Sequence, residues 1–293
     1  CGFCLYGDVD WRKSMLEKDW DGGPKKRLMP TEMAKRLIDE AAEIGIPAIK
    51  FNFRGESVLH PDYGDIVEYA AGKITDPAGW EKFGAMAGEH AGRKVFHDLL
   101  ANSNGNIPDN RWESSIRGLM ACTKTMVSLD SMDPAIYPKV RIGLSLDSAK
   151  RTINELLKRK HPDLWVRRVV CKSNKDEDFI GAVYREWPKG LKASEHFAFD
   201  RSHYAEEEVH GEDPRGWERQ FCGYPSQRIV VTSSGKYVPC CLAWENEFDA
   251  GTYPALSLKD YWTSEWRRNL AQELRQGIFK NDKCKNCTSY LAY

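Results

Sequence analysis

The sequence predicts an α/β fold in which parallel strands are wrapped by helices, as an open or closed barrel. Two observations support this class. Between residues 31 and 200, amphipathic helical segments alternate with short apolar segments of strand type. No linker rich in Ser, Gly or Pro interrupts the alternation, and no repeat of 20 to 50 residues is visible. The 293 residues are enough for one large α/β domain and a smaller second one.

The elements follow one another in a regular order. Pro30 and Thr31 begin an amphipathic helix that ends at Gly45, and residues 46–53 follow as a buried strand. The helix-then-strand cycle then repeats along the chain. We expect further helices at 62–72, 77–90, 107–119, 145–160 and 176–187, and further strands at 94–101, 123–129, 165–171 and 193–200. Because parallel strands need crossover connections, this order indicates a parallel sheet.

The pattern changes where acidic residues gather around Gly211 and Pro214. We place a domain boundary there, with a barrel domain over 1–203, a linker over 204–219 and a C-terminal domain over 220–293. In the C-terminal domain we expect a hairpin formed by 228–232 and 237–239, which turns at Ser234 and Gly235, and a helix over 258–275.

Charge and composition exclude several classes of protein. Lys plus Arg and Asp plus Glu are 43 each, so no net charge recruits nucleic acid or anionic lipid. No apolar run approaches the roughly 18 residues needed to cross a bilayer. Nine cysteines are an odd number, and no signal peptide is visible, which favours metal or redox chemistry in a reducing compartment. We therefore expect a soluble cytoplasmic protein with no membrane or nucleic-acid partner. Because Cys1 is not a start residue, we also expect further residues upstream of it.

Two cysteine pairs have the spacing of metal ligands. Cys1 and Cys4, like Cys284 and Cys287, are separated by two residues, so both thiolates of a pair can reach one metal ion or one iron–sulfur cluster. Spacing alone leaves a zinc site and a redox dithiol open as alternatives. Structural zinc usually takes two such pairs in one small module, whereas these pairs lie at opposite ends of the chain. Cys122 and Cys171 are expected to be packed as small apolar residues.

Several motifs follow in order along the chain. They are Cys1-Gly2-Phe3-Cys4, Arg54-Gly55-Glu56-Ser57 after a strand, Asn104-Gly105 at the end of the next, and Ser128-Leu129-Asp130 with Tyr137 and Arg141 downstream. This set resembles the radical S-adenosylmethionine (radical SAM) family. The first motif is similar to the last two cysteines of the family's C-x3-C-x2-C motif, and the second to its Gly-Gly-Glu-Pro loop. The chain departs from the family because the first cysteine would precede Cys1, and because Arg54 and Ser57 replace Gly and Pro.

The last quarter of the chain carries a second resemblance. Cys222-x12-Gly235-x4-Cys240, a helix after Ser257 that contains Trp262, and Cys284-x2-Cys287 resemble the SPASM/twitch extension, which binds auxiliary iron–sulfur clusters in the same family. Too few cysteines are present for the two-cluster version. Four suffice for one auxiliary [4Fe-4S] cluster, so the extension resembles the shorter twitch form.

The resemblance implies a partial (β/α)6 radical SAM barrel followed by a small C-terminal iron–sulfur domain. It implies a catalytic [4Fe-4S] cluster held by Cys1, Cys4 and an upstream cysteine. It also implies an auxiliary [4Fe-4S] cluster with Cys222, Cys240, Cys284 and Cys287 as ligands. S-adenosylmethionine (SAM) would be contacted by Phe3, Gly55, Glu56, Asn104, Ser128, Asp130, Arg141 and Asn174.

Each expected contact with SAM has a chemical reason. Gly55 permits close approach of the backbone to the methionine ammonium, and Glu56 adds negative charge there. Ser128 and Asp130, at a strand end, would bond the ribose hydroxyls, and Arg141 offers a planar fork for the methionine carboxylate. Asn104 would bond ribose or the carboxylate, although Asn-Gly is also a common turn. Asn174 is expected near the adenine, and Phe3 is expected to order the cluster loop.

Two further residues are candidate catalytic groups. Cys241 lies next to a ligand position and would donate a hydrogen atom to a substrate radical, with a buried spectator thiol as the alternative. Asp200, followed by Arg201 and His203 at the end of the last strand, would supply a base, although a polar loop exit would look the same.

The implied activity is reductive cleavage of SAM to a 5′-deoxyadenosyl radical that abstracts hydrogen from a substrate. The extension points to a peptide or protein side chain that is crosslinked, epimerised or oxidised. A sugar- or nucleotide-derived small molecule remains an alternative substrate. A zinc-stabilised binding protein, with tryptophans such as Trp11 and Trp20 as its interaction surface, remains an alternative class. The enzyme would also need an electron donor such as flavodoxin or ferredoxin.

Overall fold

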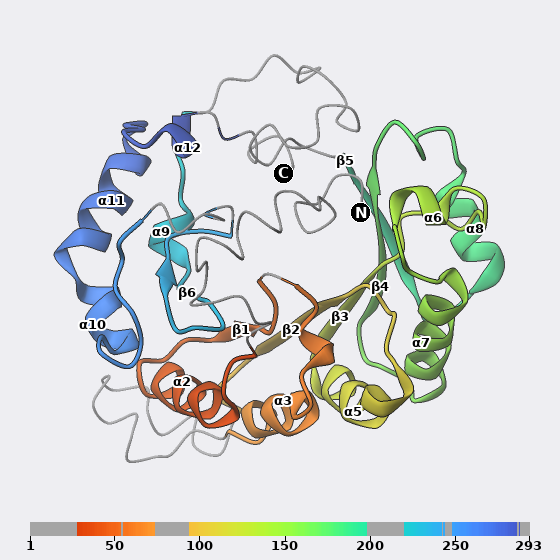
Figure 1. The fold of residues 1–293 in the computed structure, drawn as a ribbon, viewed down its shortest axis with the longest axis horizontal. Coiled ribbons are helices and arrows are strands. Elements are labelled where there is room, and N and C mark those ends of the chain that lie inside the picture. Colours follow the sequence, from red (N-terminus) through yellow and green to blue (C-terminus); the bar gives the residue numbers. More distant parts are fainter. Residues whose placement is uncertain are drawn as a thin grey trace.

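A computed structural model of the chain describes residues 28–53, 55–73, 94–197, 220–241, 243, 248–285 and 287. Within them, a curved sheet carries helices on its convex face (Figure 1). The sheet consists of β1 (Ala48–Lys50), β2 (Asp98–Ser103), β3 (Lys124–Ser128), β4 (Leu164–Val170) and β5 (Lys192–Phe197), all parallel and in this order. The predicted fold class, parallel strands wrapped by helices, is confirmed.

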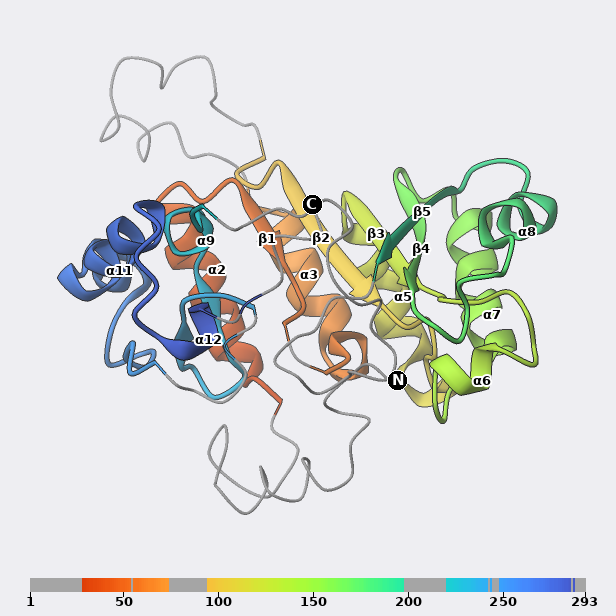
Figure 2. The same ribbon diagram turned by 90° about the horizontal axis from the view of Figure 1, so that it is seen from above.

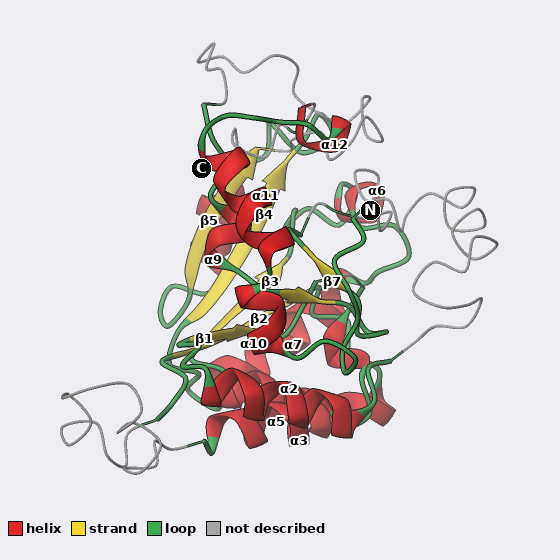
Figure 3. Cartoon of the chain, turned by 90° about the vertical axis from the view of Figure 1, so that its left-hand side faces the viewer, coloured by secondary structure: helices red, strands yellow, loops and turns green. Residues whose placement is uncertain are grey.

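The helices on the convex face are α2 (Thr31–Glu43), α3 (Tyr63–Ala71), α5 (Trp112–Ala121), α7 (Leu146–Lys158) and α8 (Phe179–Glu186). Of these, α2 precedes β1, and the other four connect consecutive strands of the sheet. Shorter turns of helix lie in the loops: η2 (Ser57–Leu59), η5 (Asp109–Arg111) and α6 (Tyr137–Val140). Figure 3 shows α2, α3 and α5 as a layer under the strands.

The main core lies between the sheet and these helices. Because side chains alternate across a strand, every second residue of β4 is buried toward the helices, among them Val166, which is 0% exposed. On the helical side, apolar residues spaced three and four apart face the sheet, as in α7 with Ile153 and Leu156. The other strands and helices of this half contribute residues to the same apolar cluster.

The C-terminal elements form a second unit at the β1 end of the sheet (Figures 1 and 2). They are α9 (Tyr224–Gln227), an antiparallel pair of β6 (Val230–Val231) and β7 (Tyr237–Val238), α10 (Leu258–Thr263), α11 (Glu265–Arg275) and α12 (Asp282–Lys285). The predicted hairpin is confirmed. Glu40 of α2 joins the two units, since its carboxylate accepts hydrogen bonds from Tyr253 Oη (2.9 Å) and the Leu258 N–H (2.8 Å). A shared apolar cluster that includes Ile38 and Tyr261 lies around this contact.

Several boundaries differ from the predicted ones. β2 runs from 98 to 103 instead of 94 to 101, because Val95 and Phe96 pack as loop residues in the second apolar cluster. The helix expected over 107–119 begins only at Trp112, after Pro108 and a turn of 3-10 helix.

The helix expected over 258–275 is also different, since it is divided into α10 and α11 at Ser264. The backbone of Ser264 is extended, and its Oγ accepts a hydrogen bond from the Arg267 N–H (3.2 Å), which caps α11. A Ser in this role ends one helix and begins the next.

Some predictions lie outside the described residues. They concern the helix at 77–90, the linker at 204–219, and Cys1, Phe3, Cys4 and Asp200. The domain boundaries stay a prediction. In the described part of the chain, no helix is long and apolar enough to cross a membrane.

Candidate functional site

Polar residues gather at the carboxyl edge of the sheet. Glu56, Asn104, Asp130 and Asn174 follow β1, β2, β3 and β4 in turn, and Ser128 is the last residue of β3. Carboxyl ends of parallel strands meet at one edge, which is where ligand sites of such sheets lie. The structure therefore brings together seven residues expected from the sequence to contact SAM: Gly55, Glu56, Asn104, Ser128, Asp130, Arg141 and Asn174.

The Glu56 carboxylate is buried at this edge and hydrogen-bonded to the neighbouring loop. Its Oε2 accepts a hydrogen bond from the Asn104 N–H (2.8 Å). Burial raises its pKa to about 7, although the Asn104 N–H, the Ser103 hydroxyl and the charge of Arg141 act in the opposite direction. Gly55, directly before it, has a φ of +70°, a conformation that other L-residues rarely adopt. A cationic ligand beside Glu56 would stabilise its charged form.

The loop after β2 is held by side-chain hydrogen bonds. Asn104 Oδ1 accepts from the Asn106 N–H (2.8 Å), and Asn106 Oδ1 accepts from the Ser145 N–H (2.7 Å) at the start of α7. Asn106 Nδ2 also lies 3.3 Å from Tyr137 Oη. Asn106 was not predicted as a site residue. Its position two residues after Asn104, in an Asn-Gly-Asn sequence typical of an Asx turn, was the available signal.

Asp130 and Arg141 pair with each other. Asp130 is fully buried, and its Oδ2 lies 2.5 Å from Arg141 Nε. Its Oδ1 accepts a hydrogen bond from the Val169 N–H at the end of β4 (2.7 Å). Burial raises the pKa of Asp130, while the charge of Arg141 opposes that shift. The sequence predicted both residues as ligand contacts, and the structure adds that each is the other's ion-pair partner.

The backbone of Asp130 has a φ of +63°, in the left-handed region. Non-glycine residues adopt this conformation only when surrounding contacts hold them there, and such residues cluster at functional sites. Asp is among the residues that tolerate it best. The carboxylate of Asp130 is thereby held toward Arg141 and the end of β4.

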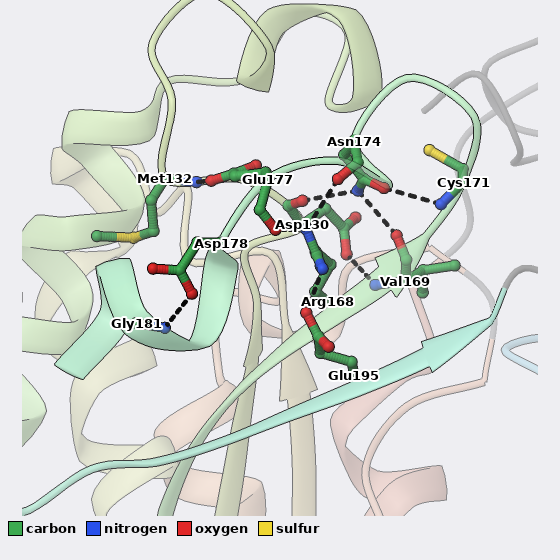
Figure 4. Close-up of polar contacts among 10 residues, drawn as sticks. All are labelled: Asp130, Met132, Arg168, Val169, Cys171, Asn174, Glu177, Asp178, Gly181 and Glu195. Atoms are coloured by element: carbon green, nitrogen blue, oxygen red, sulfur yellow. Dashed lines mark hydrogen bonds and ion pairs between the residues drawn. The ribbon is translucent and has the colours of Figure 1, made fainter.

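Asn174 connects the loops after β3 and β4 (Figure 4). Its Nδ2 donates to the carbonyl oxygens of Asp130 (2.7 Å) and Val169 (2.9 Å), and its Oδ1 accepts from the Cys171 N–H (2.8 Å). The side chain is buried, and these backbone groups use most of its hydrogen-bonding capacity. The predicted contact with adenine stays a prediction, and the observed contacts give Asn174 a bracing role.

The cysteines fall into two groups. Cys122 and Cys171 are buried, as expected for small apolar residues, and burial raises the pKa of the Cys122 thiol to about 12. Partly exposed cysteines lie in the C-terminal unit: Cys222, Cys240, Cys241, Cys284 and Cys287. Among the described residues, no three His, Cys, Asp or Glu side chains already meet as a metal-binding group. The structure thus places the expected auxiliary ligands in the C-terminal unit, and their joint ligation of a cluster stays a prediction.

Two buried donors next to these cysteines bear on what the domain binds. Tyr261 Oη on α10 and Arg267 Nε on α11 are buried and have no hydrogen-bond acceptor among the described residues. Burial raises the pKa of Tyr261 to about 12, with the charge of Arg267 lowering it and that of Cys240 raising it, which places all three groups in one neighbourhood. The four cysteines expected as ligands, together with these two buried donors, would suit a negatively charged iron–sulfur cluster.

Comparison with known proteins gives two findings. Residues 222–288 match the SPASM family, described as an iron-sulfur cluster-binding domain. The fold is similar to that of anSMEcpe with bound AdoMet, at a TM-score of 0.55 and 14% identity, over 90% of this chain and 75% of that one. A structure of anSMEcpe with AdoMet and the Kp18Cys peptide gives a TM-score of 0.51 and 15% identity, over 90% and 79%.

SuiB from Streptococcus suis is similar in fold as well, at a TM-score of 0.51 and 13% identity, over 90% of this chain and 65% of that one. No curated protein matches the sequence. The chain therefore combines an α/β fold similar to those of anSMEcpe and SuiB with a C-terminal iron–sulfur region. In particular, residues 222–288 of this chain are a SPASM domain.

Proposed function

We propose that the protein is a radical SAM enzyme that binds SAM at the carboxyl edge of the sheet, cleaves it reductively and acts on a peptide or protein side chain. The observation that carries this proposal is the set of linked polar residues after β1, β2 and β3, with Glu56, Asn104, Asp130 and Arg141 at one edge. The SPASM domain directly downstream supports it, because it adds an iron–sulfur site to the same chain.

The residues at the edge have complementary tasks toward SAM. Glu56 accepts a hydrogen bond from the methionine ammonium, for which it must be ionised, and Gly55 lets the backbone approach that group. Arg141 binds the methionine carboxylate, while Ser128 and Asp130 orient the ribose. Asn104 and Asn174 keep the loops in place through their hydrogen bonds. Cys1, Cys4 and an upstream cysteine would hold the catalytic cluster, which would supply one-electron reduction chemistry when bound, and Phe3 would order its loop.

The auxiliary cluster is proposed to have Cys222, Cys240, Cys284 and Cys287 as ligands. Tyr261 and Arg267 would donate to its sulfur atoms, since both are buried donors in the neighbourhood of Cys240. Cys241 remains the candidate hydrogen-atom donor, and Asp200 the candidate base.

The substrate class is supported by the fold comparison and by the extension itself. The anSMEcpe structure with AdoMet and the Kp18Cys peptide shows that this fold can present a peptide together with AdoMet. A flavodoxin or ferredoxin is proposed as the electron donor. A small sugar- or nucleotide-derived molecule is the second candidate substrate, because the residues at the sheet edge are assigned to the cofactor and do not select the substrate.

The proposal is tested on protein reconstituted anaerobically with iron and sulfide. We expect brown protein that converts SAM to 5′-deoxyadenosine under a strong reductant, as measured by liquid chromatography. Cys4→Ala should abolish that product, because it removes a ligand of the catalytic cluster. Cys122→Ala is the matched control, since Cys122 is buried in the apolar core and is not an expected ligand, and it should keep both iron and activity. Colourless protein with stoichiometric zinc would instead support the binding-protein class.

A further inference from the structure

We propose that Arg168 is a positioning residue for the SAM site. It holds the loop after β4 in place, so that this loop fixes Asp130 and, through Asp130, Arg141. The inference deepens the proposed function and rests on it, because Asp130 and Arg141 are taken there as SAM contacts. Neither the sequence motifs nor the fold comparison assigns a role to Arg168.

Arg168 is a buried charge whose two terminal nitrogens both have partners. The residue lies on β4 and is 4% exposed, and its guanidinium lies 5.1 Å from the ring centroid of Phe179 on α8. It forms an ion pair with Glu195 of β5. A buried guanidinium is costly unless it is paired and hydrogen-bonded, so its contacts are well specified.

A single nitrogen of Arg168 anchors two loop residues. Nη1 donates to the carbonyl oxygens of Asn174 (2.8 Å) and Glu177 (3.0 Å). Hydrogen bonds from a charged donor are stronger than those between neutral groups. Both carbonyls belong to the loop that joins β4 to α8, so Arg168 fastens that loop to the strand from which it departs.

The same two residues reach across to the loop after β3. Asn174 Nδ2 donates to the Asp130 carbonyl oxygen (2.7 Å), and Glu177 Oε1 accepts a hydrogen bond from the Met132 N–H (2.6 Å). Figure 4 shows this sequence of contacts from Glu195 through Arg168 to Asn174, Glu177 and the 130–132 segment. The residues that Arg168 anchors by their backbones are thus the ones that bridge to Asp130 and Met132 by their side chains.

The 130–132 segment depends on these hydrogen bonds for its conformation. Asp130 has a φ of +63°, so its conformation depends on outside contacts. Asn174 holds its carbonyl oxygen, the Val169 N–H holds Oδ1, and Arg141 pairs with Oδ2. If the loop after β4 loosens, Asp130 and Arg141 lose their fixed orientation. We expect affinity for SAM to fall, while the cluster ligands are untouched.

The central experiment uses the double substitution Arg168→Met with Glu195→Met in the reconstituted holoenzyme. Replacing both partners leaves no unpaired buried charge, so the protein should fold, as checked by circular dichroism and thermal unfolding. We expect the dissociation constant for SAM to rise by about tenfold or more. The rate of 5′-deoxyadenosine formation at saturating SAM and the iron content should stay within about twofold of the parent values. Arg185→Met on the exposed face of α8 is the matched control and should leave the dissociation constant, the rate and the iron content unchanged.

A second pair of variants keeps the inference testable if the double variant does not fold. Glu177→Gln retains the acceptor for the Met132 N–H, whereas Glu177→Ala removes it. The alanine variant should weaken SAM binding several-fold, and the glutamine variant should not. A folded double variant, or Glu177→Ala, that binds SAM as tightly as the parent would show that Arg168 only stabilises the fold and would overturn the inference.

Hydrogen exchange of the 130–132 segment separates this inference from the proposed function. Without SAM, exchange there should accelerate in the double variant and not in Arg185→Met. If the parent protein neither binds nor cleaves SAM, the proposed function fails, yet the exchange measurement still tests whether Arg168 fixes the segment. Unchanged exchange in the folded double variant would overturn the positioning role by itself.

Discussion

The carboxyl edge of the sheet and the cysteine-bearing C-terminal unit differ in how many of their candidate site residues are already in contact with a partner. At the edge, Glu56, Asp130 and Asn174 are hydrogen-bonded to backbone groups of neighbouring strands and loops, and Asp130 also forms an ion pair with the Arg141 side chain. In the C-terminal unit, no three His, Cys, Asp or Glu side chains of the described residues form a metal-binding group, and the buried Tyr261 Oη and Arg267 Nε have no acceptor there. Hydrogen bonding between parallel strands brings the loops at their carboxyl ends together without a ligand. Cysteines spread over a long stretch of chain would instead be brought together by a bound metal.

The largest effect should come from breaking the C-terminal site. Replacing Cys284 and Cys287 with Ala should lower iron by about four per chain, because one cluster loses two ligands. Reductive cleavage of SAM should survive at least in part, since the barrel cluster is retained, and turnover of the true substrate should fall. Gel filtration and circular dichroism come first, because loss of a structural cluster can unfold its domain. A folded variant that keeps all its iron would show that these cysteines are not cluster ligands.

The sheet edge should respond to pH through Glu56. Burial raises its folded-state pKa from 4.5 to about 7, so the folded protein binds the proton more tightly than the unfolded chain. Its contribution to stability is complete below about pH 4.5 and is lost as pH rises through about 7, a change of up to about 3 kcal/mol. Without SAM, Glu56→Gln should remove this part of the slope in denaturant titrations across that range.

Binding of SAM should show the opposite trend at the same residue. The ionised carboxylate is the form that accepts the methionine ammonium, so affinity should increase as pH rises through about 7 and then level off. Glu56→Gln should weaken binding and flatten the pH profile, as measured by equilibrium dialysis. An affinity that is independent of pH in the parent protein would contradict the contact between Glu56 and the ammonium.

A smaller effect is expected from the backbone of Asp130. Asp130→Ala and Asp130→Gly both remove the carboxylate, but only glycine adopts a φ of +63° without strain. The alanine variant should therefore be the less stable by about 1 kcal/mol, as measured by urea unfolding. Equal stability would mean that the segment changes conformation once the carboxylate is gone.

The smallest effect should be a redox shift at the auxiliary cluster. If Tyr261 donates to a cluster sulfur, Tyr261→Phe removes a hydrogen bond that favours the reduced form, and the reduction potential of that cluster should become more negative. Spectroscopically monitored redox titration measures it, with the barrel cluster as the internal control. Tyr184→Phe, at an exposed position on α8, should leave both potentials unchanged.

Sequence patterns predicted the presence of the helices and strands more accurately than their first and last residues. The helix at 31–43 and the parallel direction of the strands were predictable, because apolar periodicity and the alternation of helices with strands are visible along the chain. The first residue of β2 was not predictable. Val95 and Phe96 are apolar because they pack in the second apolar cluster, with residues of α2 and the C-terminal unit, and not because they belong to the strand. The break between α10 and α11 at Ser264 was also not predicted, because a single capping Ser does not interrupt the apolar periodicity of a helix.

By itself, the sequence determined which polar residues follow each strand and which cysteines have the spacing of metal ligands, because motif order and spacing can be read along the chain. Only the tertiary structure decided that Asp130 pairs with Arg141, that Arg168 rather than its neighbour Arg167 is buried against α8, and that Glu40 joins α2 to the C-terminal unit. These contacts join residues far apart in the sequence or depend on which face of a strand packs against a helix. They are set by how strands and helices meet, and no local pattern encodes them.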